Sequence, residues 1–198
     1  MTTLPDASLP PRYFEEVYAA NADPWGFETS PYEAAKYAAT LAALPRPRYA
    51  SAFEIGCSRG VLSERLAPRC GCLLAVDVVE SALEVARARC RHLSQARFAR
   101  MSVPAEFPAE RFDLVLVSEV GYYWSGADLA AARDKILAAL DPGGPLLLVH
   151  WTPFVHDYPL SGDEVHEGFL AAATEGRPLR RLGGRREKTY RLDLFERR

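Results

Sequence analysis

The residues best suited to chemistry lie around one short turn, Gly56-Cys57-Ser58-Arg59-Gly60, which follows an apolar stretch and precedes an amphipathic one. Glu54 stands just before this turn, and Asp77 ends the next apolar stretch. A turn of small residues lets backbone N–H groups approach a ligand closely, and a carboxylate can accept both hydroxyls of a ribose. Ligands of open parallel sheets bind at the carboxyl ends of the strands, beside the first strand-to-helix loop. The pattern therefore indicates a site for a nucleoside.

Two other chemistries share parts of this turn. A dinucleotide fingerprint requires glycines at positions i, i+2 and i+5, whereas the small residues here stand at i, i+2 and i+4. A nucleophile elbow, G-x-S-x-G, fits literally, with Ser58 as nucleophile and Asp113 and His150 in the required order. In its own fold that elbow follows several strands, but only one strand can be placed before Ser58. The third interpretation, which we favour, is a site for S-adenosylmethionine, because Glu54, the turn of small residues and Asp77 suit a nucleoside that carries an amino acid.

The elements that must position these residues alternate between strands and helices. Short apolar runs predict strands at residues 52–55, 72–76, 96–101, 112–118, 145–151 and 189–195. Apolar positions at helical spacing predict helices at residues 13–22, 30–44, 61–66, 81–90, 128–140 and 163–174. Ser30, Pro31 and Glu33 are expected to begin the second of these helices with a capping box.

This alternation is typical of a parallel sheet that helices cover on both faces. The sequence therefore predicts a single doubly wound α/β domain with a helical N-terminal cap. Residues 1–12 are expected to form a loose arm, because Pro5, Pro10 and Pro11 hinder regular structure. The helical cap is expected at residues 13–48 and the α/β core at residues 49–198.

The composition excludes several classes of protein. The 198 residues are 48% hydrophobic and 25% charged, with a formal net charge of -2, which excludes wholesale disorder. No apolar run approaches the roughly 18–20 residues that a membrane-spanning helix needs, and no secretory signal is apparent. The cysteines at 57, 70, 72 and 90 form no C-x-x-C pair and no zinc pattern. The sequence thus predicts a cytoplasmic protein with reduced cysteines and no membrane partner.

Neither the histidines nor the basic C-terminal segment predicts a further ligand. The spacing of His150, His156 and His166 fits neither H-E-x-x-H nor a helical pair, so no metal is expected. From Arg177 onward nine Lys and Arg face three Asp and Glu, a pattern that can indicate nucleic-acid binding. Because the whole chain is slightly acidic, we interpret these residues as solvated positions that flank a last strand.

Several motifs together resemble one known group of enzymes. They are Asp23-Pro24-Trp25-Gly26-Phe27, Ser30-x-Tyr32-Glu33-x-x-Lys36-Tyr37, Phe53-Glu54-Ile55-Gly56-Cys57-Ser58-x-Gly60, Ala75-Val76-Asp77, Leu140-x-Pro142-Gly143-Gly144-x-Leu146, Asp157-Tyr158-Pro159 and Gly162-Asp163-x-Val165-His166. With these motifs the chain resembles class I S-adenosylmethionine-dependent methyltransferases. More narrowly, it resembles the NodS-like family, named after the nodulation N-methyltransferase of lipochitooligosaccharide synthesis. The resemblance extends from residue 13 to residue 195.

The resemblance implies a mostly parallel seven-stranded sheet and a cofactor site for S-adenosylmethionine. Glu54 precedes the turn, and the turn itself is formed under the methionine moiety by Gly56, Ser58 and Gly60. Asp77 is expected to hold the ribose and Val78 to flank the adenine. The edge of the adenine is expected to be surrounded by Met101, Ser102 and Val103. Trp25 and Tyr32 are expected to cover the sulfonium, Lys36 to meet the cofactor's carboxylate, and Ser118 and Glu119 to face cofactor and acceptor. The chain departs from the class in having Ser58 where glycine is common and no acidic residue among Met101–Val103.

The acceptor side of the site is expected to follow the fourth and fifth strands. An amine acceptor must be unprotonated to react, and Glu119 and His150 are the candidates to orient it and take its proton. Tyr122, Tyr123 and Trp124 are expected to form an apolar floor under a sugar ring or a flat substrate. The favoured function is methylation of a small-molecule amine, such as an amino sugar or a chitooligosaccharide-like compound. The alternatives are a methyltransferase of RNA or protein that uses the basic segment, and a non-catalytic module that binds the cofactor.

Overall fold

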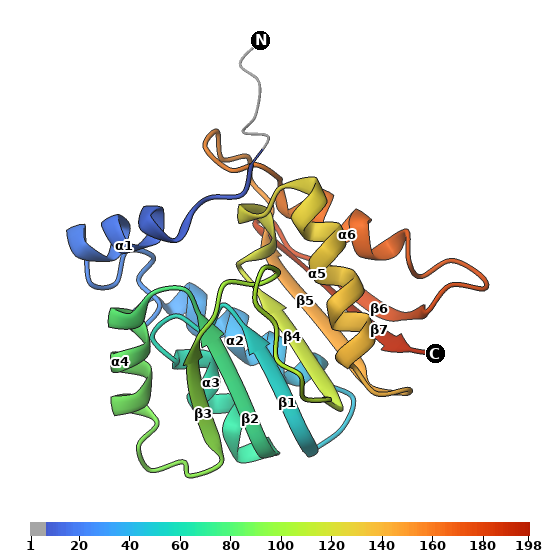
Figure 1. Cartoon of the computed structure of the whole chain (residues 1–198), viewed down its shortest axis with the longest axis horizontal. Helices are drawn as coiled ribbons and strands as arrows, with labels where there is room; N and C mark the ends of the chain where they lie inside the picture. The colour runs from blue at the N-terminus through green and yellow to red at the C-terminus, as the bar shows by residue number, and fades with distance from the viewer. Residues whose placement is uncertain (1–6) are drawn as a thin grey trace.

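Seven strands form the centre of the molecule, in a computed structural model that describes residues 7–198 (Figure 1). The strands lie in the order β3-β2-β1-β4-β5-β7-β6. Their bounds are β1 Tyr49–Ile55, β2 Cys70–Asp77, β3 Ala96–Arg100, β4 Leu114–Ser118, β5 Pro145–Trp151, β6 Leu179–Arg186 and β7 Tyr190–Arg197. The first five pair in parallel, whereas β7 runs antiparallel to both β5 and β6. The predicted doubly wound, mostly parallel seven-stranded sheet is therefore confirmed.

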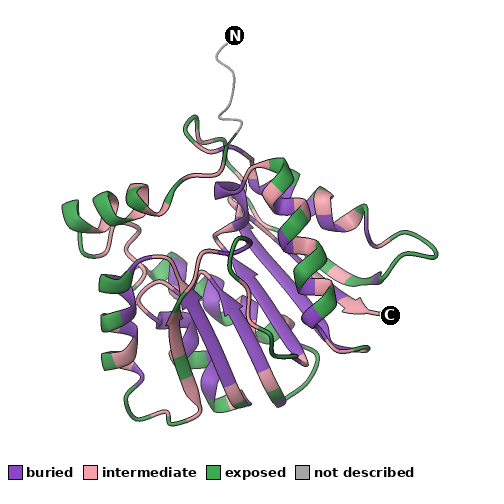
Figure 2. Ribbon diagram, viewed as in Figure 1, coloured by how far each residue is buried: buried purple, intermediate pink, exposed green. Residues whose placement is uncertain are grey.

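Helices cover both faces of this sheet. They are α1 Pro11–Ala20, α2 Pro31–Ala43, α3 Val61–Leu66, α4 Glu80–Arg89, α5 Gly126–Ala139 and α6 Gly162–Leu170, with short 3-10 turns η1 Ala67–Arg69 and η2 Gly121–Tyr123. Val115 and Val117 of β4 pack into the core beneath α5 and α6, whereas Leu114 and Leu116 pack into the core that α2, α3 and α4 cover. Successive side chains of a strand point to opposite faces, so a strand buried on both faces must be apolar throughout. Figure 2 shows this continuous burial of the central strands.

The N-terminal arm differs from the prediction for residues 1–12. Residues 1–6 lie outside the described residues. Helix α1 begins at Pro11, because a proline needs no hydrogen-bonded N–H at the first helical position. Leu9 N donates to the carbonyl of Tyr123 at 2.9 Å, and Ser8 Oγ accepts from Ser125 N at 2.8 Å. Residues 8–12 are thus attached to the core rather than loose.

The start of α2 confirms one half of the expected capping box and contradicts the other. The Ser30 side chain accepts a hydrogen bond from Glu33 N, as predicted. The Glu33 carboxylate does not return to the cap, because it turns to the Lys36 ammonium at 2.9 Å. A reciprocal capping box is found instead at the start of α6, between Ser161 and Glu164.

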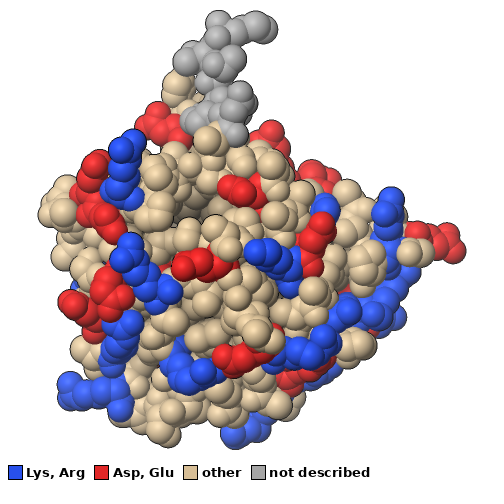
Figure 3. Space-filling view, viewed as in Figure 1, with Lys and Arg blue, Asp and Glu red and all other residues tan. Residues whose placement is uncertain are grey.

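The basic C-terminal segment contains a strand that the sequence pattern did not indicate. Strand β6 is an edge strand of arginines and glycines, so it lacks the alternation of apolar residues that reveals a half-buried strand. Its arginines form ion pairs: Arg180 with Glu196, Arg181 with Asp193 and Arg186 with Asp163. Figure 3 shows basic and acidic side chains interspersed over the visible face. The segment is therefore a hairpin of paired charges.

A row of buried side chains ties β5 to α6 and β7. His150 Nε2 accepts from Gly121 N at 3.1 Å, His150 Nδ1 lies 3.2 Å from His166 Nε2, and His166 Nδ1 lies 2.7 Å from Asp193 Oδ2. Because the Gly121 N–H can only donate, His150 Nε2 must be an acceptor. If both rings are neutral, His150 Nδ1–H then donates to His166 Nε2, and His166 Nδ1–H donates to Asp193 Oδ2. Burial, followed by the neighbouring His166, holds the pKa of His150 well below its ordinary value. Burial also lowers the pKa of His166, although Asp193 opposes this shift.

These histidines predict a loss of stability in mild acid. An unfolded histidine takes up a proton near pH 6.5, whereas the folded His150 takes one up only at lower pH. At His150 the unfolded state therefore binds more protons as the pH falls below 6.5, which decreases the free energy of unfolding. Glu54, whose pKa burial raises to about 7, acts in the opposite direction, and equally in a His150 variant. We expect the contribution of His150, measured by urea unfolding, to be a decrease of about 1 kcal/mol between pH 6.5 and pH 5.5.

His150→Gln should reduce this decrease, because glutamine does not titrate. His92→Gln, at an exposed turn position, is the matched control and should retain the full decrease. An unchanged pH dependence in His150→Gln would contradict this account of the buried histidines.

Candidate active site

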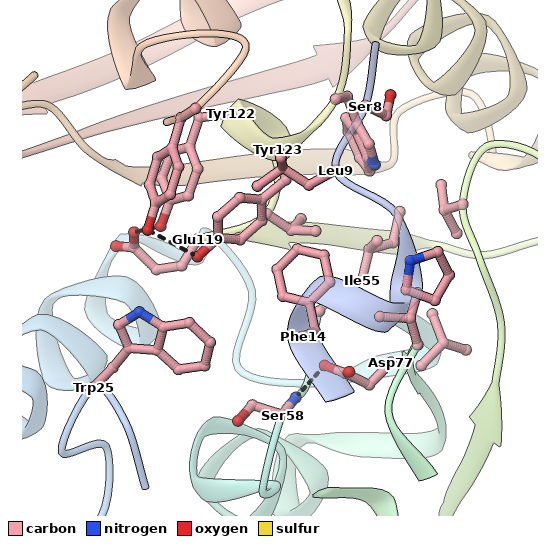
Figure 4. Close-up of a pocket in the computed structure, with 18 of the residues that line it drawn as sticks. Ser8, Leu9, Phe14, Trp25, Ile55, Ser58, Asp77, Glu119, Tyr122 and Tyr123 are labelled. Carbon is pink, nitrogen blue, oxygen red and sulfur yellow. Dashed lines mark hydrogen bonds between the residues drawn. The ribbon is translucent and has the colours of Figure 1, made fainter. Parts of the chain in front are cut away.

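A cavity of about 440 Å³ opens at the carboxyl ends of the parallel strands, beside α1 and the start of α2 (Figure 4). Because the strands lie in the order β3-β2-β1-β4-β5, the residues that follow them line up across this edge. They are Met101–Val103 after β3, Asp77 at the end of β2, Gly56 after β1, Glu119 after β4 and Trp151 at the end of β5. The cavity therefore crosses the sheet from its β3 side to β5.

Most of the predicted site residues lie together in this cavity. The predicted residues that line it are Trp25, Tyr32, Lys36, Gly56, Ser58, Asp77, Val78, Met101, Ser102, Val103, Glu119, Tyr122, Tyr123 and Trp124. The predicted residues that do not line it are Glu54, Gly60, Ser118 and His150.

The turn after β1 brings backbone N–H groups close to the Asp77 carboxylate. Ser58 N donates to Asp77 Oδ2 at 2.8 Å, and Val79 N donates to Asp77 Oδ1 at 3.0 Å. Each carboxylate oxygen retains a further lone pair for a ligand. Burial raises the pKa of Asp77, and the backbone N–H groups of Val79, Ser58 and Val78 oppose this shift. Two backbone donors thus hold a partly buried acceptor at the cavity wall.

The turn needs small residues for two reasons. Gly56 has φ +82°, and a Cβ there would lie 3.0 Å from Val120 Cβ and 3.3 Å from the Ser118 carbonyl. Ser58 has φ 49°, a left-handed conformation that is uncommon outside glycine. Its hydroxyl is hydrogen bonded to the Tyr18 hydroxyl of α1. The departure from glycine at Ser58 therefore gives the turn a contact with the N-terminal helix.

Three of the four residues outside the cavity support it from behind. Glu54 is buried and accepts from the Ser63 hydroxyl at 2.6 Å, and burial raises the pKa of Glu54 to about 7. Gly60 precedes α3 with φ +74°, where a Cβ would lie 2.8 Å from Ala86 Cβ, so glycine lets α3 approach α4. Ser118 is buried and lines a small separate hollow under the turn, together with Glu54. These residues position the turn and do not face the cavity.

The prediction that His150 contacts the acceptor is wrong. Its ring is fully buried, and both nitrogens are engaged, one by Gly121 N and the other by His166. The carboxyl end of β5 instead presents Trp151 to the cavity. Because successive residues of a strand face opposite sides, a strand-end position alone did not determine which of the two side chains faces the site.

A buried ion cluster joins the start of α2 to the end of β4. Lys36 Nζ lies 2.9 Å from Glu33 Oε1 and 2.7 Å from Glu119 Oε1. Glu119 Oε2 accepts from the Tyr122 hydroxyl at 2.6 Å and from Trp151 N at 3.0 Å. Burial disfavours the charged form of Lys36, but the two carboxylates outweigh it and raise the pKa of Lys36. Lys36 is therefore a charged group held within the chain's own network.

Aromatic rings form most of the remaining wall. Tyr122 stacks on Tyr158 with centroids 5.1 Å apart, and Tyr123 meets Phe14 of α1 edge to face at 4.7 Å. Figure 4 shows Phe14 and Trp25 beside the Ser58–Asp77 hydrogen bond. The sequence did not assign Phe14, Trp151 or Tyr158 to the site. The motif Asp157-Tyr158-Pro159 was the available signal for the last of these.

Residues 7–198 contain no arrangement typical of a metal site or of a membrane-spanning helix. No group of three or more His, Cys, Asp or Glu side chains in this range is arranged to hold a metal ion. None of the helices described combines the length and the apolar character that a membrane crossing requires.

Comparisons with known sequences identify relatives of the chain. The family model of nodulation protein S (NodS) matches residues 14–150, more than half of the chain. Nodulation protein S of Rhizobium tropici is 35% identical over 127 residues, which cover 63% of this chain and 53% of the relative. The chain thus spans about half the length of this curated relative.

Two solved structures are also similar. A candidate methyltransferase from Pseudomonas syringae is 40% identical, with a TM-score of 0.73 and coverage of 84% of this chain and 99% of that one. The N-methyltransferase NodS of Bradyrhizobium japonicum, in complex with S-adenosylhomocysteine, is 27% identical, with a TM-score of 0.79 and coverage of 94% and 97%. These matches confirm the resemblance drawn from the motifs. The chain belongs to the nodulation protein S (NodS) family.

Proposed function

We propose that this protein is an S-adenosylmethionine-dependent methyltransferase that acts on the amine nitrogen of a small molecule, such as an amino sugar or a chitooligosaccharide-like compound. The observation that carries the proposal is the order of groups along the cavity. Four groups follow one another across the sheet: the edge formed by Met101–Val103, the Asp77 carboxylate, the Gly56–Ser58 turn and the Lys36–Glu119 pair. This order matches adenine, ribose, sulfur and amino acid in the cofactor. The complex of Bradyrhizobium NodS with S-adenosylhomocysteine supports the same proposal.

The aromatic residues of the N-terminal helices suit the cofactor's charge. When bound, the cofactor supplies an electrophilic methyl group on a positively charged sulfur. Trp25 lines the cavity from the segment between α1 and α2, and Tyr18 packs edge to face against it at 5.5 Å. An aromatic face attracts a cation by about 0.5–2 kcal/mol. These rings are proposed to cover the sulfonium and exclude water from it.

The chain's contribution to the reaction is mainly positioning. Methyl transfer gains most from holding the acceptor nitrogen in line with the methyl group and from excluding water. Tyr122, Tyr123 and Tyr158 form a wall on the β4 and β5 side, where an acceptor ring can pack. Glu119 lies between this wall and Lys36, and its two oxygens fix Lys36, Tyr122 and Trp151 in place. No covalent intermediate is needed.

The arginines of β6 and β7 do not favour a macromolecular acceptor. Arg180, Arg181, Arg186 and Arg191 each pair with a carboxylate of the chain itself. A surface that binds nucleic acid instead presents an excess of cations to phosphates. The small-molecule acceptor therefore remains the proposal.

The acceptor class is tested by supplying radiolabelled S-adenosylmethionine with chitooligosaccharides that carry either a free amine or an N-acetyl group. We expect label in the free-amine compounds only, because an acetylated nitrogen has no available lone pair. Label in RNA or protein, or in neither saccharide, would contradict the proposed acceptor.

Asp77→Asn should weaken binding of S-adenosylhomocysteine by about 10- to 100-fold, since it removes a charged acceptor from the ribose hydroxyls. Titration calorimetry measures the affinity, and circular dichroism checks the fold. Asp134→Asn, on the exposed face of α5, is the matched control. Unchanged affinity in a folded Asp77→Asn protein would remove Asp77 from the cofactor site.

Glu119→Gln should lower the rate of methyl transfer by about 100-fold, because Lys36 and Tyr122 lose their common anchor. The affinity for S-adenosylhomocysteine should also fall, by about tenfold, because Glu119 holds Lys36 at the end of the cavity proposed for the cofactor's amino acid. Tyr122→Phe keeps the carboxylate and removes one hydrogen bond, so its rate should lie between those of the parent and Glu119→Gln. A normal rate in Glu119→Gln would show that this cluster does not position the acceptor.

A further inference from the structure

One carboxylate oxygen at the cavity has no partner. Glu33 Oε2 is buried and makes no hydrogen bond, and it is alone in this among the side-chain atoms of residues 7–198. The Glu33 side chain is 9% exposed, and Glu33 lines the cavity. Buried polar atoms are almost always hydrogen bonded, and an unsatisfied one is costly. Such an atom at a cavity wall indicates a donor that arrives with the ligand.

The neighbouring Lys36 has one N–H donor without a partner. Its ammonium carries three N–H donors, of which Glu33 Oε1 and Glu119 Oε1 take two. One donor is left for a ligand. Glu33 and Lys36 lie three residues apart on α2, so their side chains share one face of the helix. A free acceptor and a free donor therefore lie side by side at the cavity wall.

The net charge of the cluster favours a cation beside Glu33. Two carboxylates, Glu33 and Glu119, surround the single ammonium of Lys36. Burial raises the pKa of Glu33; Lys36 opposes this shift, and the charges of Glu119 and Asp23 add to it. When both carboxylates are ionised they outnumber the ammonium of Lys36, so the cluster is net negative and Glu33 Oε2 lacks a positively charged partner. An ammonium group is the natural partner for such an oxygen.

The position of the cluster indicates which ammonium group would bind to Glu33 Oε2. The cluster contacts the end of β4 through Glu119, on the far side of the Gly56 turn from Asp77 and Met101. A nucleoside whose ribose lies at Asp77 extends its 5′ substituent across the turn toward this cluster. In S-adenosylmethionine that substituent ends in an α-ammonium and an α-carboxylate. A free acceptor beside a free donor complements this zwitterion.

We propose that Glu33 Oε2 binds the α-ammonium of the cofactor's methionine moiety, while the third N–H of Lys36 binds its α-carboxylate. This inference rests on the proposed function, since it assumes the cofactor. It adds Glu33 as a binding residue that recognises the amino-acid end. Glu119 then serves to hold Lys36 for this contact.

The test uses three ligands that differ only at this end: S-adenosylhomocysteine, its analogue without the α-amino group, and 5′-methylthioadenosine, which lacks the whole amino-acid end. Calorimetry on the parent protein should show about 10- to 100-fold weaker binding of the deaminated analogue than of S-adenosylhomocysteine. Glu33→Gln should weaken S-adenosylhomocysteine by a similar factor and leave the other two ligands within about threefold. Glu84→Gln, on the exposed surface of α4, is the matched control and should bind like the parent.

The outcomes separate this inference from the proposed function. If the parent binds none of the three ligands, the proposed function fails. If the parent binds all three and distinguishes them, but Glu33→Gln binds S-adenosylhomocysteine normally, Glu33 does not contact the α-ammonium. A lower rate of methyl transfer with unchanged cofactor affinity in Glu33→Gln would assign the oxygen to the acceptor amine instead, and would overturn the inference. Equal binding of the deaminated analogue by the parent would also overturn it, without the need for any variant.

Discussion

The buried ion pair between Lys36 and Glu119 is the constraint on which the site depends. It joins α2, in the N-terminal helical cap, to the residue that follows β4 at the centre of the sheet. Neither charge can be buried alone, because an unpaired ion in an apolar interior is far more costly than a paired one. The chain must therefore bring these segments together, and the cavity lies where they meet. Tyr122 and Trp151 join the same pair through Glu119, so the aromatic wall is fixed by it as well.

The Asp77 side of the cavity could be predicted from the sequence because its signals are local. The turn after β1 needs glycine where φ is positive, and Asp77 needs backbone donors from the turn itself and from the residues that follow it. Both requirements are visible as residue types at fixed spacing. The apolar runs of β2, β4 and β5 likewise identify strands that are buried on both faces. The alternation of elements then fixes the fold class.

Contacts between distant segments could not be predicted in the same way. His150 and Trp151 are neighbours in sequence, yet one lies in the core and the other at the cavity. The direction of the side chain depends on the register of β5 against β4 and β7, which the sequence of β5 alone does not specify. Glu33 presents the same difficulty. Local spacing favoured a capping role, but the ammonium of Lys36, already committed to Glu119, attracts the carboxylate more strongly.

The outermost strand, β6, leaves one margin of the sheet open, with backbone groups that another chain could extend. Arg180, Arg181, Arg185 and Arg186 all lie on this strand. A second copy aligned there would have to cover the ion pairs that these arginines form with the chain's own carboxylates, and burying charged groups is costly. The two adjacent glycines, Gly183 and Gly184, further weaken the strand as a template. The arginines and glycines that give β6 no apolar alternation therefore also make it a poor template for a second chain.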